Sequence, residues 1–139
     1  MNGDGARKRL EEARVGRLAT ADSSGVPHVV PFTFVVDGDT IYWVVDEKPK
    51  RSRDLKRLAN IRANPNVEVV VDHYDEDWAN LWWVRASGPA RILEDGDEAR
   101  RALALLAAKY QQDRASPPEG PVVAVEVAHL AWWEGSPPS

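Results

Sequence analysis

The sequence predicts a mainly β protein, an antiparallel β-barrel of six or more strands with helices packed on its outside. Short stretches of alternating apolar and polar residues recur along the chain, and turn sequences such as Asp37-Gly38-Asp39 separate them. Only two segments have the apolar spacing of a substantial helix. Hairpin turns between the strands favour an antiparallel barrel over a doubly wound parallel sheet.

A short helix and a hairpin begin the chain. Residues 6–13 contain Leu10 as their only large apolar residue, which predicts a helix with a solvated, charged surface. The pattern then alternates, and a Gly-containing turn over 22–25 connects predicted strands over 15–21 and 26–36.

Two prolines give the second strand a special position. Pro27 and Pro31 cannot donate to a strand ladder, so this strand is expected at an edge, at a bulge, or where backbone is open toward a ligand. After a tight turn, residues 40–45 form the predicted third strand.

The remaining elements alternate between helix and strand. Leu55, Leu58 and Ile61 recur at helical spacing, which predicts an amphipathic helix from about residue 52 until Asn64-Pro65-Asn66 ends it. The later elements are predicted strands over 67–74 and 81–93, the second with a bend at Gly88-Pro89, a helix over 99–110 and a last strand over 122–133.

Composition indicates one globular domain over residues 1–139, with a core over 10–133 and a polar tail over 134–139. The net charge of -4 disfavours a dedicated nucleic-acid binder. The absence of cysteine excludes disulfides and thiolate sites, and it is compatible with the cytoplasmic location that we expect. Apolar stretches are too short to span a bilayer, and the polar start has no signal core, so neither membrane insertion nor secretion is expected.

Tryptophan usage is unusual. The chain has six tryptophans, and Trp82-Trp83 and Trp132-Trp133 are adjacent pairs. Because neighbouring residues of a strand face opposite sides, each pair places one indole on each face. The pairs therefore predict a core on one side of the sheet and a partner chain or ligand on the other, with a large aromatic core as the alternative for any single tryptophan.

A basic segment lies between the third and fourth predicted strands. Six of the 18 basic residues fall within ten positions: Lys48, Lys50, Arg51, Arg53, Lys56 and Arg57. A cationic loop that runs into a helix N-terminus combines positive charge, free backbone donors and the helix dipole, as a phosphate site requires. Ser52 adds a hydroxyl that can cap the helix or bond a phosphate oxygen. A solvated helix face is the alternative, and the local excess of charge favours an anionic ligand.

Other chemistry has little support in the sequence. His28, His73 and His129 are isolated, so no metal site is expected. Gly-rich nucleotide-binding loops and a nucleophile elbow do not occur, and no general base is evident. No catalytic residue is therefore assigned, and a bound cofactor is expected to supply the reactivity.

Several motifs follow one another in a characteristic order: Arg17-Leu18-Ala19-Thr20, Gly25 to Phe32, Ile41-Tyr42-Trp43, Leu58 to Ile61 and Asn64-Pro65-Asn66-Val67. In this order they resemble the pyridoxamine 5'-phosphate oxidase-like split β-barrel family, which binds flavin mononucleotide (FMN). The resemblance covers residues from about 10 to 133. The segments over 46–50 and 78–85 resemble a small actinobacterial branch that uses the deazaflavin coenzyme F420 in place of FMN.

The resemblance implies a homodimer with two equivalent cofactor sites at the subunit interface. The cofactor's phosphate would meet basic residues after the third strand, and its ring would lie along strand backbone. By resemblance, the phosphate candidates are Lys50, Arg51, Ser52, Lys56 and Arg57, with Asn60 helping to fix the helix. Val30, Pro31 and Phe32 would border the ring, while Trp78, Trp82 or Trp83, and Arg85 would come from the other subunit.

The expected function is that of an oxidoreductase. It would transfer a hydride between reduced coenzyme F420 and an unsaturated or quinone-like small molecule. The excess of basic residues would suit the phosphodiester and oligoglutamate tail of that coenzyme. Two alternatives remain, an FMN-binding flavin oxidoreductase of the same fold and a non-catalytic protein that binds or stores the cofactor. The chain lacks the C-terminal Arg-and-His substrate motif of true pyridoxamine phosphate oxidases, so oxidation of vitamin B6 is not expected.

Overall fold

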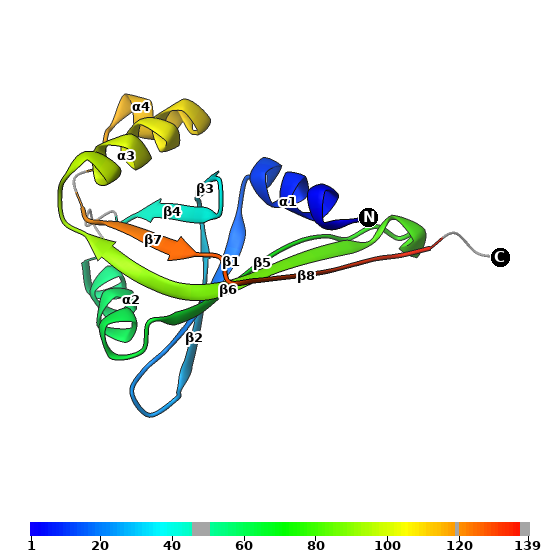
Figure 1. Ribbon diagram of the computed structural model, residues 1–139, viewed down its shortest axis with the longest axis horizontal. Helices are drawn as coiled ribbons and strands as arrows, with labels where there is room; N and C mark the ends of the chain where they lie inside the picture. Colours follow the sequence, from blue (N-terminus) through cyan, green and yellow to red (C-terminus); the bar gives the residue numbers. More distant parts are fainter. Residues whose placement is uncertain (46–50, 119, 137–139) are drawn as a thin grey trace.

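The chain forms an eight-stranded sheet flanked by helices (Figure 1). The computed structural model describes residues 1–45, 51–118 and 120–136, with the backbone alone over 51–55. In chain order the elements are α1 (Gly3–Glu12), β1 (Gly16–Ala21), β2 (Pro27–Phe32), β3 (Val35–Asp37), β4 (Thr40–Val44), α2 (Arg51–Ala63), β5 (Asn66–His73), the 3-10 turn η1 (Trp78–Asn80), β6 (Trp82–Leu93), α3 (Asp97–Lys109), α4 (Gln111–Ala115), β7 (Val122–Glu126) and β8 (His129–Glu134).

The long strand β6 belongs to two parts of the sheet. Its first part pairs with β5 and β8, and its last residues pair with β7. The strand order is β2-β1-β5-β6-β7-β4-β3, with β8 beside β6, and the pairs are antiparallel. This arrangement confirms the mainly β class with flanking helices, as expected of a split barrel. In the described part of the chain the sheet does not close, and β2 and β3 form its two ends.

Gly88 lies where β6 passes from one part of the sheet to the other. A β-carbon at this position would lie 1.8 Å from the carbonyl oxygen of Glu126. Only glycine therefore lets the end of β7 approach β6 this closely. The bend that the sequence predicts at Gly88-Pro89 is accounted for by this contact.

The prediction of one strand over 26–36 is wrong. The first part of this segment pairs with β1 as β2, and its last part pairs with β4 as the separate strand β3. The crossing occurs at Phe34, which is fully buried. Its backbone N–H donates to the hydroxyl of Tyr110 at 3.2 Å and not to a neighbouring strand.

The single strand predicted over 122–133 is wrong for a similar reason. Between β7 and β8, the N–H of Val127 donates to the carbonyl of Asp39, and the N–H of Ala128 donates to the carbonyl of Ser87. These long-range bonds redirect the chain from β4 toward β6. The short helix α4 is also absent from the sequence prediction.

The main core lies between the two parts of the sheet. Leu18, Val69, Val84 and Val125 pack there from four strands, and Trp43 is also buried. Ala6 and Leu10 of α1 and Leu58 and Ile61 of α2 complete this core. A second cluster joins α3 to β4 and β7, and Figure 1 shows α3 above these strands. No helix in the described residues is long and apolar enough to cross a bilayer.

Candidate functional site

The sheet formed by β2, β1, β5, β6 and β8 has one face on the core and a second face that no helix of the described residues covers. In Figure 1, β5, β6 and β8 extend together as an arm, and α1 lies on the other side of this arm from the uncovered face. The pairing registers place Pro31, Arg17, Val70, Arg85 and Ala131 in one row across the five strands. These side chains are exposed or half-buried, as expected for the solvent side of a sheet. We call this surface, with the neighbouring pair Trp83 and Trp133, the open face.

The adjacent tryptophans lie on opposite faces of the sheet, as the alternation predicts. Trp82 lies on the core side, where the guanidinium carbon of Arg9 in α1 is 4.7 Å from its ring centroid. Trp83 lies on the open face opposite Trp133, and the guanidinium carbon of Arg85 is 5.2 Å from its ring centroid. Trp133 is 45% exposed, so the open face carries aromatic surface that this chain does not cover.

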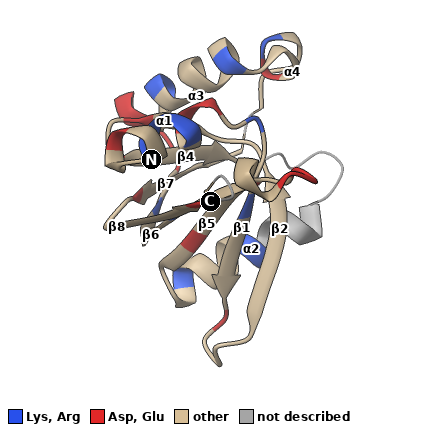
Figure 2. Ribbon diagram, turned by 90° about the vertical axis from the view of Figure 1, so that its right-hand side faces the viewer, with Lys and Arg blue, Asp and Glu red and all other residues tan. Residues whose placement is uncertain are grey.

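The open face carries charges of both signs, because the registers that place Arg17 and Arg85 on it also place the exposed Glu68 and Asp72 there. The Nε atom of Arg85 lies 3.4 Å from Glu68 Oε2, an exposed pair that contributes at most about 1 kcal/mol. Arg17 donates to the carbonyl of Gly16 at 3.5 Å, and no carboxylate among the described residues pairs with it. In Figure 2, β6, β5, β1 and β2 lie side by side in this order. Arg17 is a candidate binding residue that the sequence analysis did not assign to the site. The signal for it was a single charged residue within a predicted strand of otherwise mostly apolar residues.

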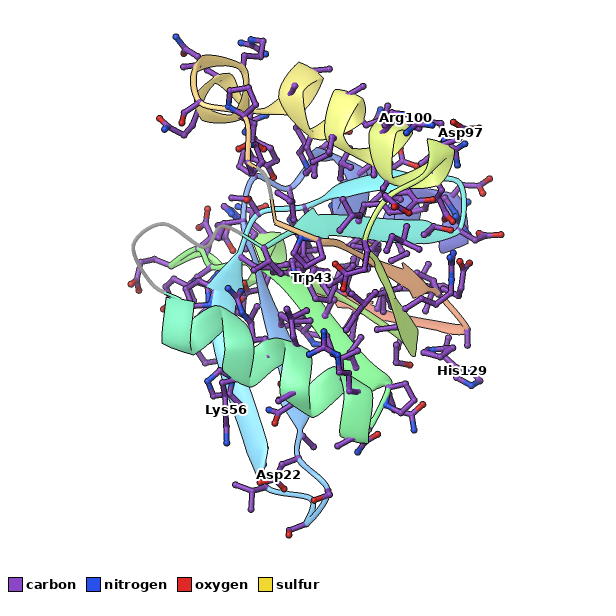
Figure 3. All side chains as sticks on the ribbon, turned by 90° about the vertical axis from the view of Figure 1, so that its left-hand side faces the viewer. Asp22, Trp43, Lys56, Asp97, Arg100 and His129 are labelled. Carbon is purple, nitrogen blue, oxygen red and sulfur yellow. The ribbon has the colours of Figure 1, made fainter. Side chains whose placement is uncertain are left out.

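The predicted phosphate segment is only partly described. Lys50 lies outside the described residues, and only the backbone of Arg51 and Ser52, at the start of α2, is described. Lys56 is exposed on the same helix. Figure 3 shows the Lys56 side chain projecting from α2 toward the end of the molecule where the β1–β2 hairpin carries Asp22. Hydrogen bonds from the backbone of Val26 and nearby residues, together with the charge of Lys56, lower the pKa of Asp22.

Asn60 fixes α2 to the sheet. Its side chain is buried, and its Nδ2 donates to Oγ1 of the buried Thr20 at 3.1 Å. Arg57 is half-buried and its Nε is shielded from solvent. The helix is thus held against β1 while the ammonium of Lys56 stays in solvent.

The residues expected to border a ring do not all face the same way. Pro31 lies on the open face, whereas Val30 and Phe32 lie on the core side of β2. Phe32 is 6% exposed, and its ring makes an edge contact with Trp43 at 5.5 Å. Val30 and Phe32 can therefore offer mainly backbone groups to a ligand on the open face. Trp78 is 67% exposed in η1, at the end of the arm.

Among the described residues, neither the histidines nor the hollow beside α3 indicates a second candidate site. His28 lies opposite Thr20, and its buried Nδ1 has no hydrogen-bond partner among the described residues. Over the same residues, no group of three metal-binding side chains is placed to hold an ion. A hollow beside the start of α3, lined by Leu93, Gly96 and Val122 among others, contains none of the predicted site residues.

The sequence matches the family described as pyridoxamine 5'-phosphate oxidase over residues 4–134. The chain belongs to this family. The match spans every strand, and it agrees with the antiparallel sheet and flanking helices. A comparison with curated proteins finds no match.

Solved structures share the pyridoxamine 5'-phosphate oxidase fold. A conserved hypothetical protein from Mycobacterium tuberculosis is 19% identical, with a TM-score of 0.75 over 96% of this chain and 85% of the other. An FAD-binding protein from Mesorhizobium loti is 22% identical, with a TM-score of 0.72 over 95% and 94%. The heme storage protein HutZ from Vibrio cholerae is 14% identical, with a TM-score of 0.71 over 95% and 93%. At these identities the likeness is one of fold.

The predicted site residues do not all lie on one surface of the chain. Pro31, Trp83 and Arg85 share the open face, whereas Lys56, Arg57 and Asn60 belong to α2, which packs on the core side of β1. Within one chain the two sets therefore lie on opposite sides of the sheet. The prediction that Trp83 and Arg85 act from the other subunit is compatible with this separation.

Proposed function

We propose that the chain is a homodimeric oxidoreductase that binds coenzyme F420 at the dimer interface and uses it to reduce an unsaturated or quinone-like small molecule. The observation that carries the proposal is the open face, where Arg17, Arg85 and Trp83 lie together and no helix of the described residues covers them. A second chain would cover this face and bring its own α2 to the ligand.

The side chains of the open face fit a flat, anionic cofactor. Guanidinium groups bind phosphate and carboxylate oxygens through two parallel hydrogen bonds, and Arg17 has no competing carboxylate among the described residues. Val70 and Trp83 offer apolar and aromatic surface on which a ring system can lie. The face therefore has both types of contact that such a cofactor needs.

The position of Arg17 supports the choice of the deazaflavin over FMN. A single phosphomonoester can be held by the basic segment before and within α2. Arg85 is paired with Glu68, whereas Arg17 has no carboxylate partner among the described residues, and it would suit a further anionic group such as the glutamate tail of coenzyme F420. A cation at Arg17, away from α2, supports a cofactor with more than one negative group.

Hydride transfer places simple demands on the protein. The bound cofactor supplies the hydride, and the chain has to orient it and exclude water from the reactants. Trp83 and Trp133 could form one apolar wall of such a site when a second chain covers them. No residue of the chain is assigned a proton-transfer role.

The test is a comparison of cofactors followed by an assay for turnover. We expect sedimentation of a dimer, tighter binding of coenzyme F420 than of FMN, and loss of reduced-cofactor absorbance with some member of a panel of enones and quinones. Tighter binding of FMN would select the flavin oxidoreductase alternative. Binding of coenzyme F420 without turnover of any member would select the carrier alternative.

A further inference from the structure

The end of α3 binds both backbone groups of Phe34, the residue at which the chain leaves β2 and enters β3. The Tyr110 hydroxyl accepts the N–H of Phe34 at 3.2 Å, and it lies 3.0 Å from the carbonyl oxygens of Phe34 and Arg14, either of which it can donate to. The ammonium of Lys109 donates to the same Phe34 carbonyl at 2.9 Å. The polar groups at this crossing are thus satisfied from a helix that is distant in sequence.

Further contacts join the end of α1 to the same cluster. The Nζ atom of Lys109 lies 4.5 Å from the ring centroid of Phe34 and 3.3 Å from the carbonyl oxygen of Glu11. Arg14 donates to the carbonyl of Lys109 at 2.8 Å, and its guanidinium carbon lies 4.8 Å from the ring centroid of Tyr110. Burial, with a smaller contribution from Arg14, lowers the pKa of Lys109 to about 8. We call Arg14, Phe34, Lys109 and Tyr110 the crossing clamp.

The crossing clamp is only a few residues from the open face. The rings of Phe34 and Phe32 are stacked with centroids 4.9 Å apart, and Pro31 precedes Phe32 in β2. Within the described residues β2 is an edge strand, and β1 is the one strand that pairs with it there. A displacement of Phe34 would therefore pass through Phe32 to Pro31.

We propose that Lys109 and Tyr110 are positioning residues, which hold the β2–β3 crossing and thereby set the place of Pro31 on the open face. They act through Phe34, to whose backbone groups both residues bind. The buried residues of α3, Ala99, Ala102 and Leu106, lie earlier in the helix, and the ring of Tyr110 packs against their cluster, so Tyr110→Phe keeps this packing and removes only the hydroxyl. The consequence for cofactor affinity rests on the proposed function, whereas the effect on the crossing does not.

Amide hydrogen exchange over residues 27–34 tests the positioning role in the full chain. We expect Lys109→Met and Tyr110→Phe each to raise the exchange rate of this segment about fivefold or more, as the loss of one buried hydrogen bond would do. Lys109→Arg keeps a cationic donor and should restore slow exchange. Lys8→Met is the matched control, because Lys8 is an exposed lysine whose nearest carboxylate oxygen, on Glu12, is 3.9 Å away. Melting temperatures and exchange over β5 show whether each variant is folded.

A titration with coenzyme F420 and with FMN separates the positioning of the crossing from its consequence for cofactor affinity. Weaker binding by Lys109→Met, with recovery in Lys109→Arg, would support the link from the clamp to the site. Unchanged exchange over 27–34 in both Lys109→Met and Tyr110→Phe would overturn the positioning role, whatever the affinity. If the parent binds neither cofactor, the proposed function fails, and the exchange data alone decide whether the clamp holds the crossing.

Discussion

Arg17 and Arg85 lie on either side of Val70 in one row of the open face, because Arg17 pairs with Val70 and Val70 pairs with Arg85 across β1, β5 and β6. Neighbouring strands are about 4.8 Å apart, so the α-carbons of the two arginines are separated by about 10 Å. At this spacing one ligand can reach both guanidinium groups across the apolar side chain of Val70, with Glu68 as the competitor for Arg85.

Removal of Arg17 should weaken cofactor binding. We expect Arg17→Ala to lower the affinity for coenzyme F420 about tenfold at low salt, since an exposed charge-assisted contact contributes about 1.5 kcal/mol. Quenching of tryptophan fluorescence measures the affinity. Arg100→Ala is the matched control, because Arg100 is an exposed arginine on α3, an element that is not part of the open face; Figure 3 shows it at the opposite end of the molecule from Asp22 in the β1–β2 hairpin. Equal affinities of Arg17→Ala and the parent would remove Arg17 from the site.

Two neighbouring cations of α2 should respond differently to substitution. Lys56→Ala should weaken cofactor binding and leave the melting temperature unchanged, because its side chain is exposed. Arg57→Ala should lower the melting temperature as well, because the Nε of Arg57 is buried. Titrations at two salt concentrations and thermal melts distinguish the variants. A solvated helix face, the alternative for this segment, would give normal cofactor affinity for Lys56→Ala.

The Asn60–Thr20 hydrogen bond should stabilise the fold. Asn60→Ala leaves the buried Thr20 hydroxyl without its donor, and we expect the free energy of unfolding to fall by about 1 to 3 kcal/mol. Urea denaturation of Asn60→Ala, Thr20→Val and the double variant measures the coupling between the two side chains. Strictly additive effects of the two substitutions would show that this bond does not fix α2.

Local patterns in the sequence predict a large part of this structure. Alternation places Trp82 and Trp83 on opposite faces, and Gly88-Pro89 indicates the bend of β6. The crossings near Phe34 and Val127 could not be predicted in this way, because their hydrogen-bond partners, such as Tyr110 and Asp39, are remote in sequence.

The candidate site is less accessible to sequence reasoning than the fold. Arg17 is a single charge on a strand, and the same pattern would describe an ordinary solvated face. The strand register makes Arg17 a candidate site residue, because it places Arg17 in a row with Pro31 and Arg85. Only strand pairing, a long-range property, reveals that row.

Acid should destabilise the contact between α3 and the sheet. Hydrogen bonds from Arg91 and Tyr42 lower the pKa of Glu98 to about 2 in the folded chain, from its ordinary value of 4.5. The unfolded chain therefore takes up this proton first as the pH falls, so the contribution of Glu98 is fully present above about pH 4.5 and is lost between pH 4.5 and 2.

Comparison of Glu98→Gln with the parent checks this dependence. The variant should melt at a lower temperature at neutral pH, and the difference should shrink as the pH falls through this range. Glu94→Gln serves as the control, because Glu94 is exposed and its nearest partner, Arg62, is 4.0 Å away. A difference between parent and Glu98→Gln that stays constant with pH would show that Glu98 is not held as an ion in the folded state.

Hydrogen exchange with and without coenzyme F420 tests most directly whether the open face binds an anionic redox cofactor. The account predicts that the cofactor slows exchange over 16–21, 66–73 and 82–87, the strand segments that carry Arg17, Val70 and Arg85, and that exchange in α3 does not change. Cofactor-induced protection confined to segments outside the open face, or no protection with either coenzyme F420 or FMN, would contradict it.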